Sequence, residues 1–211
     1  MSQLTLYHAS PSRSATVLWM LEEIGEPYDV RMLSLTNNDQ HKPDYLAINP
    51  LGKVPALKHG DAVITEVSAI CTYLADEFPK VKLNIPTGNP LRGVYLKWLF
   101  FGPSVLEPAV TERAFPRKEP PRAGAIGWRD IDTVADVIAK ALKPGPYLMG
   151  EQFTAADVVI GSGVRWGTMF KLVPDRPEFG PYIARISERA ALKSSDAKDK
   201  ELAAASGAKP A

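Results

Sequence analysis

The sequence has few of the residues that build metal sites and disulfide frameworks. Its 211 residues include one cysteine, Cys71, and three histidines, His8, His41 and His59. A single cysteine excludes an internal disulfide framework and fits a reducing compartment. None of these four residues forms a CxxC or HxxxH pair, the spacings typical of metal sites, so we expect no metal. Cys71 falls on the apolar side of a helical pattern, and we interpret it as a buried core residue.

The chain also lacks a strong net charge and a long apolar run. Its 25 basic and 24 acidic residues give a net charge of +1, which provides no general attraction to nucleic acid or to an anionic membrane. No apolar stretch approaches the ~20 residues of a membrane span, because Lys97 interrupts the densest one, residues 95–101. The first residues lack the basic and apolar regions of a secretory signal. We therefore expect a cytoplasmic protein with no nucleic-acid or membrane partner.

The charges divide unevenly along the chain. Residues 1–80 carry 6 basic and 10 acidic side chains, whereas residues 81–211 carry 19 and 14. Residues 79–90 between them contain proline, lysine and asparagine with little periodicity, which is typical of a linker. The length suits one large domain or two small ones. We interpret the chain as two domains, residues 1–80 and 89–211.

The hydrophobic pattern predicts different structures on the two sides of this linker. Residues 4–8 and 28–35 alternate as strands do, and a helical pattern closed by Gly25 lies between them. Two short strands, 54–57 and 62–65, precede a helix that begins at Glu66. The order is βαβ–ββα. After the linker only helical patterns follow: 91–114, bent at Gly102, Pro103 and Pro108, then 126–142, 181–189 and 191–205, with a capping-box spacing at Thr154–Asp157. The fold class is α/β plus all-α.

Three serines, Ser10, Ser12 and Ser14, stand at the junction of the first strand and the first helix. The unpaired N–H groups and the dipole of a helix N-terminus favour negative charge there. A second helix begins at Glu66, and two helix starts at one end of a small sheet would suit a ligand with separate anionic groups. Any one serine could instead cap its helix, so the residues alone leave both interpretations open.

Two longer strings resemble a known family. Asn49-Pro50-Leu51-Gly52-Lys53-Val54-Pro55-Ala56-Leu57 and Ile64-Thr65-Glu66-Val67-Ser68-Ala69-Ile70-Cys71-Thr72-Tyr73-Leu74 are similar to motifs of the cytosolic glutathione S-transferases, in particular bacterial-type members, and Thr154–Asp157 is similar to that family's helical capping motif. The resemblance implies an N-terminal thioredoxin-like domain, an all-helical C-terminal domain and usually a homodimer. It also implies conjugation of the glutathione thiolate to hydrophobic electrophiles, as in detoxification.

The resemblance also implies how glutathione is held. Val54–Pro55 matches the cis-proline turn, where the backbone of Val54 would pair with the cysteinyl backbone of glutathione as an added strand does. The Glu66 carboxylate suits the γ-glutamyl ammonium, and the N–H of Val67 suits its α-carboxylate. The family usually has serine where this chain has Val67, so one hydroxyl hydrogen bond is missing.

Position and charge make His41 and Lys53 the candidates for the glycyl carboxylate of glutathione. For the group that stabilises the thiolate, Ser12-Arg13 before Trp19 matches the Ser-Arg pair of bacterial members, so we predict Ser12. Ser10 is the alternative, since a one-residue difference in the loop would exchange the two.

The resemblance places the electrophile beside the helical domain, where Phe101 and Trp166 are candidates, although core packing explains them equally well. The same thiolate could serve a peroxidase or an isomerase. A protein of another class, a non-catalytic module of this fold used for dimerisation or assembly, is the remaining alternative.

Overall fold

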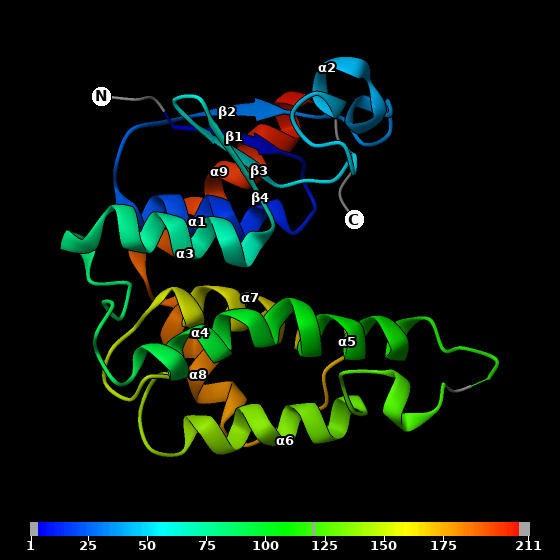
Figure 1. Ribbon diagram of the computed structural model, residues 1–211, viewed down its shortest axis with the longest axis vertical. Helices are drawn as coiled ribbons and strands as arrows, with labels where there is room; N and C mark the ends of the chain where they lie inside the picture. The colour runs from blue at the N-terminus through cyan, green and yellow to red at the C-terminus, as the bar shows by residue number, and fades with distance from the viewer. Residues whose placement is uncertain (1–3, 120, 207–211) are drawn as a thin grey trace. The chain divides into compact units, whose positions relative to one another are not determined.

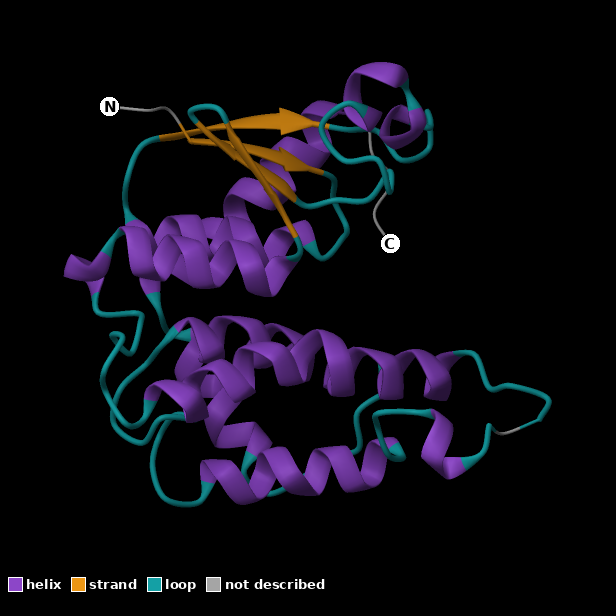
Figure 2. Ribbon diagram, in the orientation of Figure 1, coloured by secondary structure: helices purple, strands orange, loops and turns teal. Residues whose placement is uncertain are grey.

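The computed structural model describes residues 4–119 and 121–206. The chain divides into two compact units, one formed by residues 1–81 together with 189–211 and the other by residues 82–188. We call them the α/β unit and the helical unit, since all four strands of the described sheet lie in the first (Figure 2). The division differs from the expected ranges 1–80 and 89–211 in the last segment, because residues from Arg189 onward group with the α/β unit.

A four-stranded sheet forms the centre of the α/β unit. Its strands are β1 (Leu4–His8), β2 (Tyr28–Met32), β3 (Ala56–His59) and β4 (Ala62–Thr65), and their spatial order is β2-β1-β3-β4. β1 and β2 are parallel, whereas β3 runs antiparallel to both β1 and β4. A parallel pair needs a crossover helix, which the chain supplies between β1 and β2. The predicted βαβ–ββα order of a thioredoxin-like domain is confirmed (Figure 1).

Three helices complete this unit. α1 (Ser14–Ile24) and α3 (Val67–Glu77) lie on the same face of the sheet (Figure 1). α9 (Ala190–Ser206) packs along α1. Between β2 and β3 the chain forms a 3-10 turn (Asp39–His41) and the short α2 (Pro43–Leu46). The core between sheet and helices consists of side chains with no exposed area, among them Leu6, Leu18, Leu57, Ile70 and Leu74. Burying each such side chain contributes about 1.5–3 kcal/mol.

The helical unit contains α4 (Arg92–Phe101), α5 (Glu107–Ala114), α6 (Ile131–Leu142), α7 (Ala155–Met169) and α8 (Phe179–Ser187). A π-helical segment, Gly102–Leu106, joins α4 to α5, so the bend predicted at Gly102 and Pro103 is a local widening of one continuous helix. Gly102 also permits close packing, because a Cβ atom there would lie 2.7 Å from Cγ1 of Val159 on α7. α6 begins at Ile131 rather than at 126, since Asp130 accepts a hydrogen bond from the Thr133 N–H at 2.9 Å and caps the helix.

The predicted capping box at the start of α7 is confirmed. Asp157 is fully buried and accepts hydrogen bonds from the N–H groups of Thr154 (3.0 Å) and Leu148 (2.9 Å) and from the hydroxyl of Tyr182 (3.1 Å). Burial raises the pKa of this carboxyl to about 6, against the lowering effect of the hydrogen bonds. Asp157 therefore ties α7 to a loop and to α8, and its role is structural.

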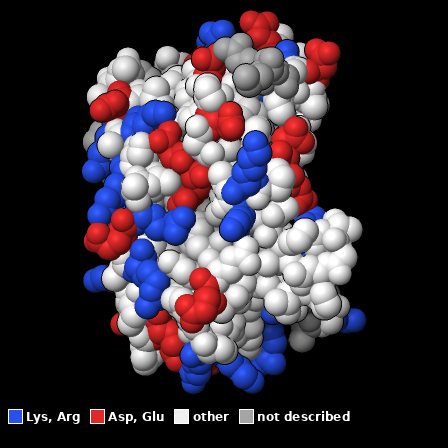
Figure 3. Space-filling view, turned by 90° about the vertical axis from the view of Figure 1, so that its left-hand side faces the viewer, with Lys and Arg blue, Asp and Glu red and all other residues white. Residues whose placement is uncertain are grey.

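Charged side chains of both signs are interleaved on the face drawn in Figure 3. This distribution agrees with the net charge of +1. In the part of the chain that the structure describes, no helix combines the length and apolar character needed to cross a membrane.

Candidate functional site

The strand register brings the predicted site segments to one end of the sheet. Tyr7, near the end of β1, lies opposite Ala56, the first residue of β3, and Ala56 lies opposite Thr65, the last residue of β4. The loop after β1, the turn before β3 and the start of α3 therefore meet at the same end. The serines, the Val54–Pro55 turn and the Glu66–Val67 pair belong to these three segments, so the topology groups residues that are far apart in the sequence.

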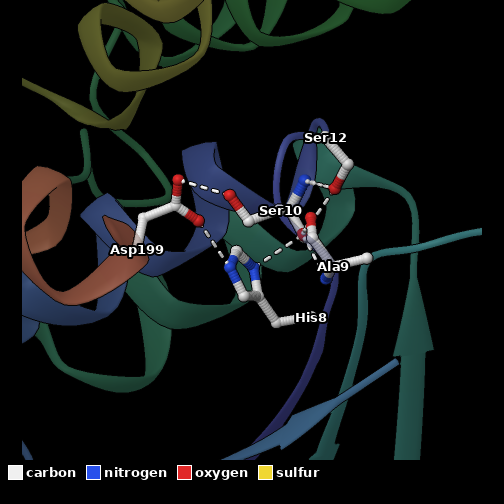
Figure 4. Close-up of polar contacts among 6 residues, drawn as sticks. His8, Ala9, Ser10, Ser12 and Asp199 are labelled. Atoms are coloured by element: carbon white, nitrogen blue, oxygen red, sulfur yellow. Dashed lines mark hydrogen bonds and ion pairs between the residues drawn. The ribbon is translucent and has the colours of Figure 1, made fainter. Parts of the chain in front are cut away.

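A connected set of polar side chains surrounds the junction of β1 and α1 (Figure 4). The hydroxyl oxygens of Ser12 and Ser14 are 2.6 Å apart, and the Ser14 Oγ is 2.7 Å from Nδ1 of His8. Nε2 of His8 in turn lies 2.7 Å from Oδ1 of Asp199 on α9. His8 and Ser14 have no exposed area, whereas Ser12 is half-buried. Ser12 is thus the partly exposed serine of the Ser12–Ser14–His8 series, and Asp199 at its other end is also partly exposed.

Ser10 takes a different place in the same network. Its hydroxyl donates to Oδ2 of Asp199 at 2.8 Å. The carboxylate accepts from both His8 and Ser10, and although burial raises the pKa of Asp199, these hydrogen bonds hold it below its usual range. Asp199 is therefore ionised at neutral pH, and the Ser10 proton is engaged by a charged acceptor.

The turn before β3 has the geometry that the resemblance implied. The Val54–Pro55 peptide bond is cis. The carbonyl of Lys53, the residue before Val54, accepts hydrogen bonds from the Tyr45 hydroxyl at 2.5 Å and from the Asn49 side-chain amide at 2.7 Å. These two hydrogen bonds fix the backbone of the turn on the side of Tyr45 and Asn49. Val54 itself is half-buried.

The His41 ring lies against Gly52, the residue that precedes Lys53. A Cβ atom on Gly52 would lie only 2.6 Å from Cδ2 of His41, and Gly52 has a φ of +61° that favours glycine. The His41 ring therefore packs directly on the backbone that precedes Lys53. His41 is further held by a 3.0 Å hydrogen bond between its Nδ1 and the Asn38 side chain. Both His41 and Lys53 are exposed, as groups that bind a carboxylate from solvent must be.

Glu66 stands between β4 and α3 in an unusual backbone conformation. Its φ of 69° and ψ of 120° lie outside the regions that non-glycine residues prefer. Such a conformation costs about 1–3 kcal/mol and is found mainly at functional sites. Its side chain makes no capping bond to α3 and is exposed. The carboxylate therefore faces solvent beside the N-terminus of α3, where Val67 is the first helical residue.

Phe101 and Trp166 both belong to the helical unit. Phe101 contacts Trp98 edge-on, with ring centroids 5.2 Å apart, and Trp166 stacks on Phe170 at 5.4 Å. Both are half-buried. A hollow of about 280 Å³ in the same unit is lined by other residues: Pro103, Glu107, Pro108, Thr111, Glu112, Phe115, Arg117 and Trp128. The electrophile site stays a prediction.

The geometry of the His, Cys, Asp and Glu side chains bears on metal and thiol chemistry. Within residues 4–119 and 121–206, no group of three or more His, Cys, Asp or Glu side chains is placed to hold a metal ion. Cys71 is fully buried, and burial raises the pKa of its thiol. A buried, protonated thiol is unreactive, which fits the interpretation of Cys71 as a core residue.

Sequence reasoning missed three members of the polar network, His8, Ser14 and Asp199. Ser14, one of the three serines at the strand–helix junction, provides the hydroxyl that links Ser12 to His8. The cluster of serines next to a histidine was a signal that could have identified two of them. Nothing in the local pattern indicated Asp199, which is 191 residues from His8.

Comparison with known proteins places the chain among glutathione transferases. Residues 2–76 match the family model "Glutathione S-transferase, N-terminal domain". Glutathione S-transferase GstA of Escherichia coli O157:H7 is 30% identical over 76% of this chain and 79% of its own length. Glutathione S-transferase 1 of Schizosaccharomyces pombe is 29% identical over 82% of this chain and 78% of its own length.

Solved structures give the same result. BphK, a bacterial GST solved as a ternary complex, superposes with a TM-score of 0.79 at 26% identity, over 93% of this chain and 99% of its own. A glutathione transferase homologue from Sulfitobacter with bound glutathione has a TM-score of 0.76 at 27% identity, over 96% of this chain and 100% of its own.

Proposed function

Because the chain belongs to the cytosolic glutathione S-transferase family and is a glutathione transferase, we propose that it conjugates the thiolate of glutathione to hydrophobic electrophiles and that Ser12 stabilises the thiolate. A free thiol has a pKa of about 8.5, so it needs stabilisation to ionise fully at neutral pH. One hydroxyl donor and the N-terminus of α1 supply this stabilisation.

The polar network is the observation that favours Ser12 over Ser10. The Ser10 hydroxyl donates to the ionised carboxylate of Asp199, a stronger acceptor than a thiolate sulfur. The Ser12 hydroxyl instead contacts another hydroxyl, that of Ser14, and receives the Ser14 N–H at 3.1 Å. Two neutral partners leave Ser12 able to turn its proton toward a bound sulfur; both serines are half-buried, so the hydrogen-bond partners and not the exposure favour Ser12.

The glutathione backbone is assigned to the end of the sheet. Val54, beside the cis bond to Pro55, pairs with the cysteinyl unit through its backbone groups. Glu66 binds the γ-glutamyl ammonium, and the Val67 N–H at the start of α3 binds the neighbouring carboxylate. His41, which packs on Gly52, and Lys53, the next residue along the chain, bind the glycyl carboxylate at the other end of the tripeptide.

The remaining assignments follow the family. Phe101 and Trp166 of the helical unit contribute to the site of the electrophile, two copies of the chain form a homodimer, and glutathione is a co-substrate that needs no metal. The protein works in the cytoplasm, and detoxification is its general role.

Retention on immobilised glutathione and a conjugation assay with an aromatic chloride test this proposal. Wild type should bind and turn over. Ser12→Ala should keep glutathione binding and lose about 10²-fold in kcat, the usual effect of removing one donor to a developing anion. Ser10→Ala is the matched control and should stay within about 3-fold of wild type, since its hydroxyl faces Asp199. A wild type that neither binds nor turns over would support the non-catalytic module, and equal activity of Ser12→Ala and wild type would remove Ser12 from the mechanism.

Activity toward an organic hydroperoxide, measured on the same preparations, separates conjugation from peroxidase use of the thiolate. We expect conjugation to be the faster reaction. A higher kcat/KM with the hydroperoxide would reassign the chemistry without changing the glutathione site.

A further inference from the structure

A chain of hydrogen bonds leads from the half-buried Ser12 into the core of the α/β unit. It passes from Ser12 Oγ to Ser14 Oγ (2.6 Å), from there to Nδ1 of His8 (2.7 Å), and from Nε2 of His8 to Asp199 (2.7 Å). His8 ends β1, Ser12 lies in the loop that follows and Ser14 begins α1, whereas Asp199 comes from α9 (Figure 4). Each link is short enough for a proton to move along it.

The order Ser14–His8–Asp199 has the composition of a hydrolase triad, but its geometry excludes that use. A triad serine must reach its substrate, whereas Ser14 has no exposed area. Its hydroxyl also contacts both the N–H and the carbonyl of Ala9 at 3.1 Å, which fixes it in place. Ser14 therefore connects groups, and the member that can meet a ligand is Ser12.

The Ser14 hydroxyl links the protonation of His8 to the orientation of the Ser12 hydroxyl, because its oxygen has a limited number of protons and lone pairs. This oxygen donates one proton and accepts two, and the Ala9 N–H always occupies one accepting position. When Nδ1 of His8 carries no proton, the Ser14 proton points to it, and the second accepting position takes the Ser12 proton. When Nδ1 carries a proton, His8 fills that second position, and the Ser12 proton must point elsewhere. The protonation of His8 thus decides whether the Ser12 hydroxyl faces inward or outward.

We propose that His8 receives the thiol proton of glutathione through Ser12 and Ser14, with Asp199 as the positioning residue that stabilises the resulting imidazolium. The proposal rests on the proposed role of Ser12. The thiol gives its proton to Ser12 Oγ, the Ser12 proton moves to Ser14 Oγ, and the Ser14 proton moves to Nδ1 of His8. The products are a thiolate and an imidazolium, the complex of protein and glutathione neither gains nor loses a proton, and the Ser12 hydroxyl now donates to the sulfur.

The charges around His8 favour this transfer. Asp199 faces Nε2 as a carboxylate, so it selects the tautomer whose proton is on Nε2 and leaves Nδ1 ready to accept. The acidic residues of the adjoining α1, Glu22 and Glu23, are engaged by Lys198 of α9 and by Arg189, which immediately precedes α9. On the β2 side, the contact with His8 is a backbone one, from the Leu33 N–H to the His8 carbonyl.

The first test uses the wild-type protein alone. Glutathione is added in weakly buffered solution with a pH indicator, and thiolate formation is followed by its ultraviolet absorbance. S-methylglutathione, which has no thiol proton, corrects for proton changes caused by binding. We expect thiolate to form with much less than one proton released per site. Release of one proton for each thiolate would show that the proton goes to solvent, and the proposal would be wrong.

The second test compares His8→Gln and Asp199→Asn with Glu201→Gln, an exposed residue of the same helix. In both relay variants we expect kcat/KM at neutral pH to fall by about 10²-fold, the usual contribution of a positioned base. KM for glutathione should change little, and the rate should approach that of wild type at alkaline pH, where the solvent can take the proton. Glu201→Gln should behave as wild type.

The outcomes separate this inference from the proposed function. If Ser12→Ala loses the thiolate absorbance while both relay variants keep it, the relay is absent and the role of Ser12 stands. If Ser12→Ala also keeps it, the proposed function has the wrong residue. A loss in the relay variants that is the same at every pH, together with weaker binding of S-methylglutathione, would indicate a structural role only and contradict the relay. If the variants do not fold, the proton-release measurement on wild type decides.

Discussion

The guanidinium of Arg189 binds both oxygens of the Glu23 carboxylate, at 2.6 and 2.7 Å. Glu23 lies on α1, and Arg189 immediately precedes α9. The carboxylate, only 7% exposed, also accepts the Trp19 indole N–H at 2.9 Å. This bidentate ion pair fixes the start of α9 against α1. α9 in turn places Asp199 within hydrogen-bond distance of His8.

Arg189→Ala should lower the free energy of unfolding by about 1–3 kcal/mol, because it leaves a nearly buried carboxylate without its charged partner. Arg189→Lys should recover only part of this loss, since an ammonium cannot bind both oxygens in the same way. Urea unfolding measures both values. Lys200→Ala, an exposed residue of the same helix, is the control and should change stability little. Equal stability of Arg189→Ala and the control would show that the pair does not hold α9.

Val67→Ser should restore the hydroxyl that the family usually has at this position. One further hydrogen bond contributes about 0.5–1.5 kcal/mol, so the Kd for glutathione should fall by roughly 2- to 10-fold. Calorimetric titration with glutathione measures the change. Val63→Ser, an exposed position on the neighbouring β4, should leave the Kd unchanged. If Val67→Ser binds no more tightly than wild type, the γ-glutamyl carboxylate is not at the start of α3.

Gly52→Ala should destabilise the protein by about 1–3 kcal/mol, since alanine is strained at a positive φ. Its Cβ would also lie 2.6 Å from the His41 ring and 2.9 Å from the carbonyl of Gln40. Displacement of His41 should raise the Kd for glutathione as well.

Gly93→Ala provides a matched control, because a Cβ at this helical position meets nothing within 4 Å. It should stabilise the protein by about 0.5–1 kcal/mol, the helix preference of alanine over glycine. Thermal unfolding and glutathione titration of both variants check the pair. An unchanged Kd in Gly52→Ala would contradict the placement of His41 in the glutathione site.

Asp157 should make stability depend on pH between about 4 and 6. Burial raises its pKa to about 6 in the folded protein, above the usual value of 3.8. A raised pKa means that the folded state holds the proton more tightly, so the stabilisation is complete below about pH 4 and is lost as the pH rises through 6. The size of the change is on the order of 2–3 kcal/mol.

Asp157→Asn cannot titrate and should lack this dependence. The difference in unfolding free energy between wild type and Asp157→Asn, measured by urea unfolding at several pH values, should therefore shrink from pH 4 to pH 7. A difference that is constant or grows over this range would show that the carboxyl is ionised throughout, held by its hydrogen bonds.

Local features of the fold could be predicted because neighbouring residues determine them. Gly25 ends α1 with a φ of 73° and donates its N–H to Leu21, as a glycine after a helical pattern should. The alternating strand of residues 4–8 has the same bounds in the structure. The second strand ends at Met32 instead of residue 35, since apolar alternation continues into the loop while pairing with β1 stops at His8.

The position of α9 could not be predicted in the same way. Its sequence, AALKSSDAKDKELAAAS, predicts a helix but contains only two large apolar residues, Leu192 and Leu202. These are too few to show which face is buried or what the helix packs on. Hydrogen bonds and ion pairs from Arg189, Ser194 and Lys198 join this segment to Glu22 and Glu23 of α1. Polar contacts of this kind leave no periodic signal.

The sequence by itself determined the order of elements, the capping box and the family motifs around Val54–Pro55 and Glu66, because each depends on residues within a few positions of one another. Only the tertiary structure decided which hydrogen-bond partner each of the serines has, the choice on which the proposal of Ser12 over Ser10 rests. That choice depends on Asp199, which engages Ser10 directly and His8 from 191 residues away. Hydrogen bonds between distant segments exist only once the chain has packed, since packing alone sets the distances on which they depend.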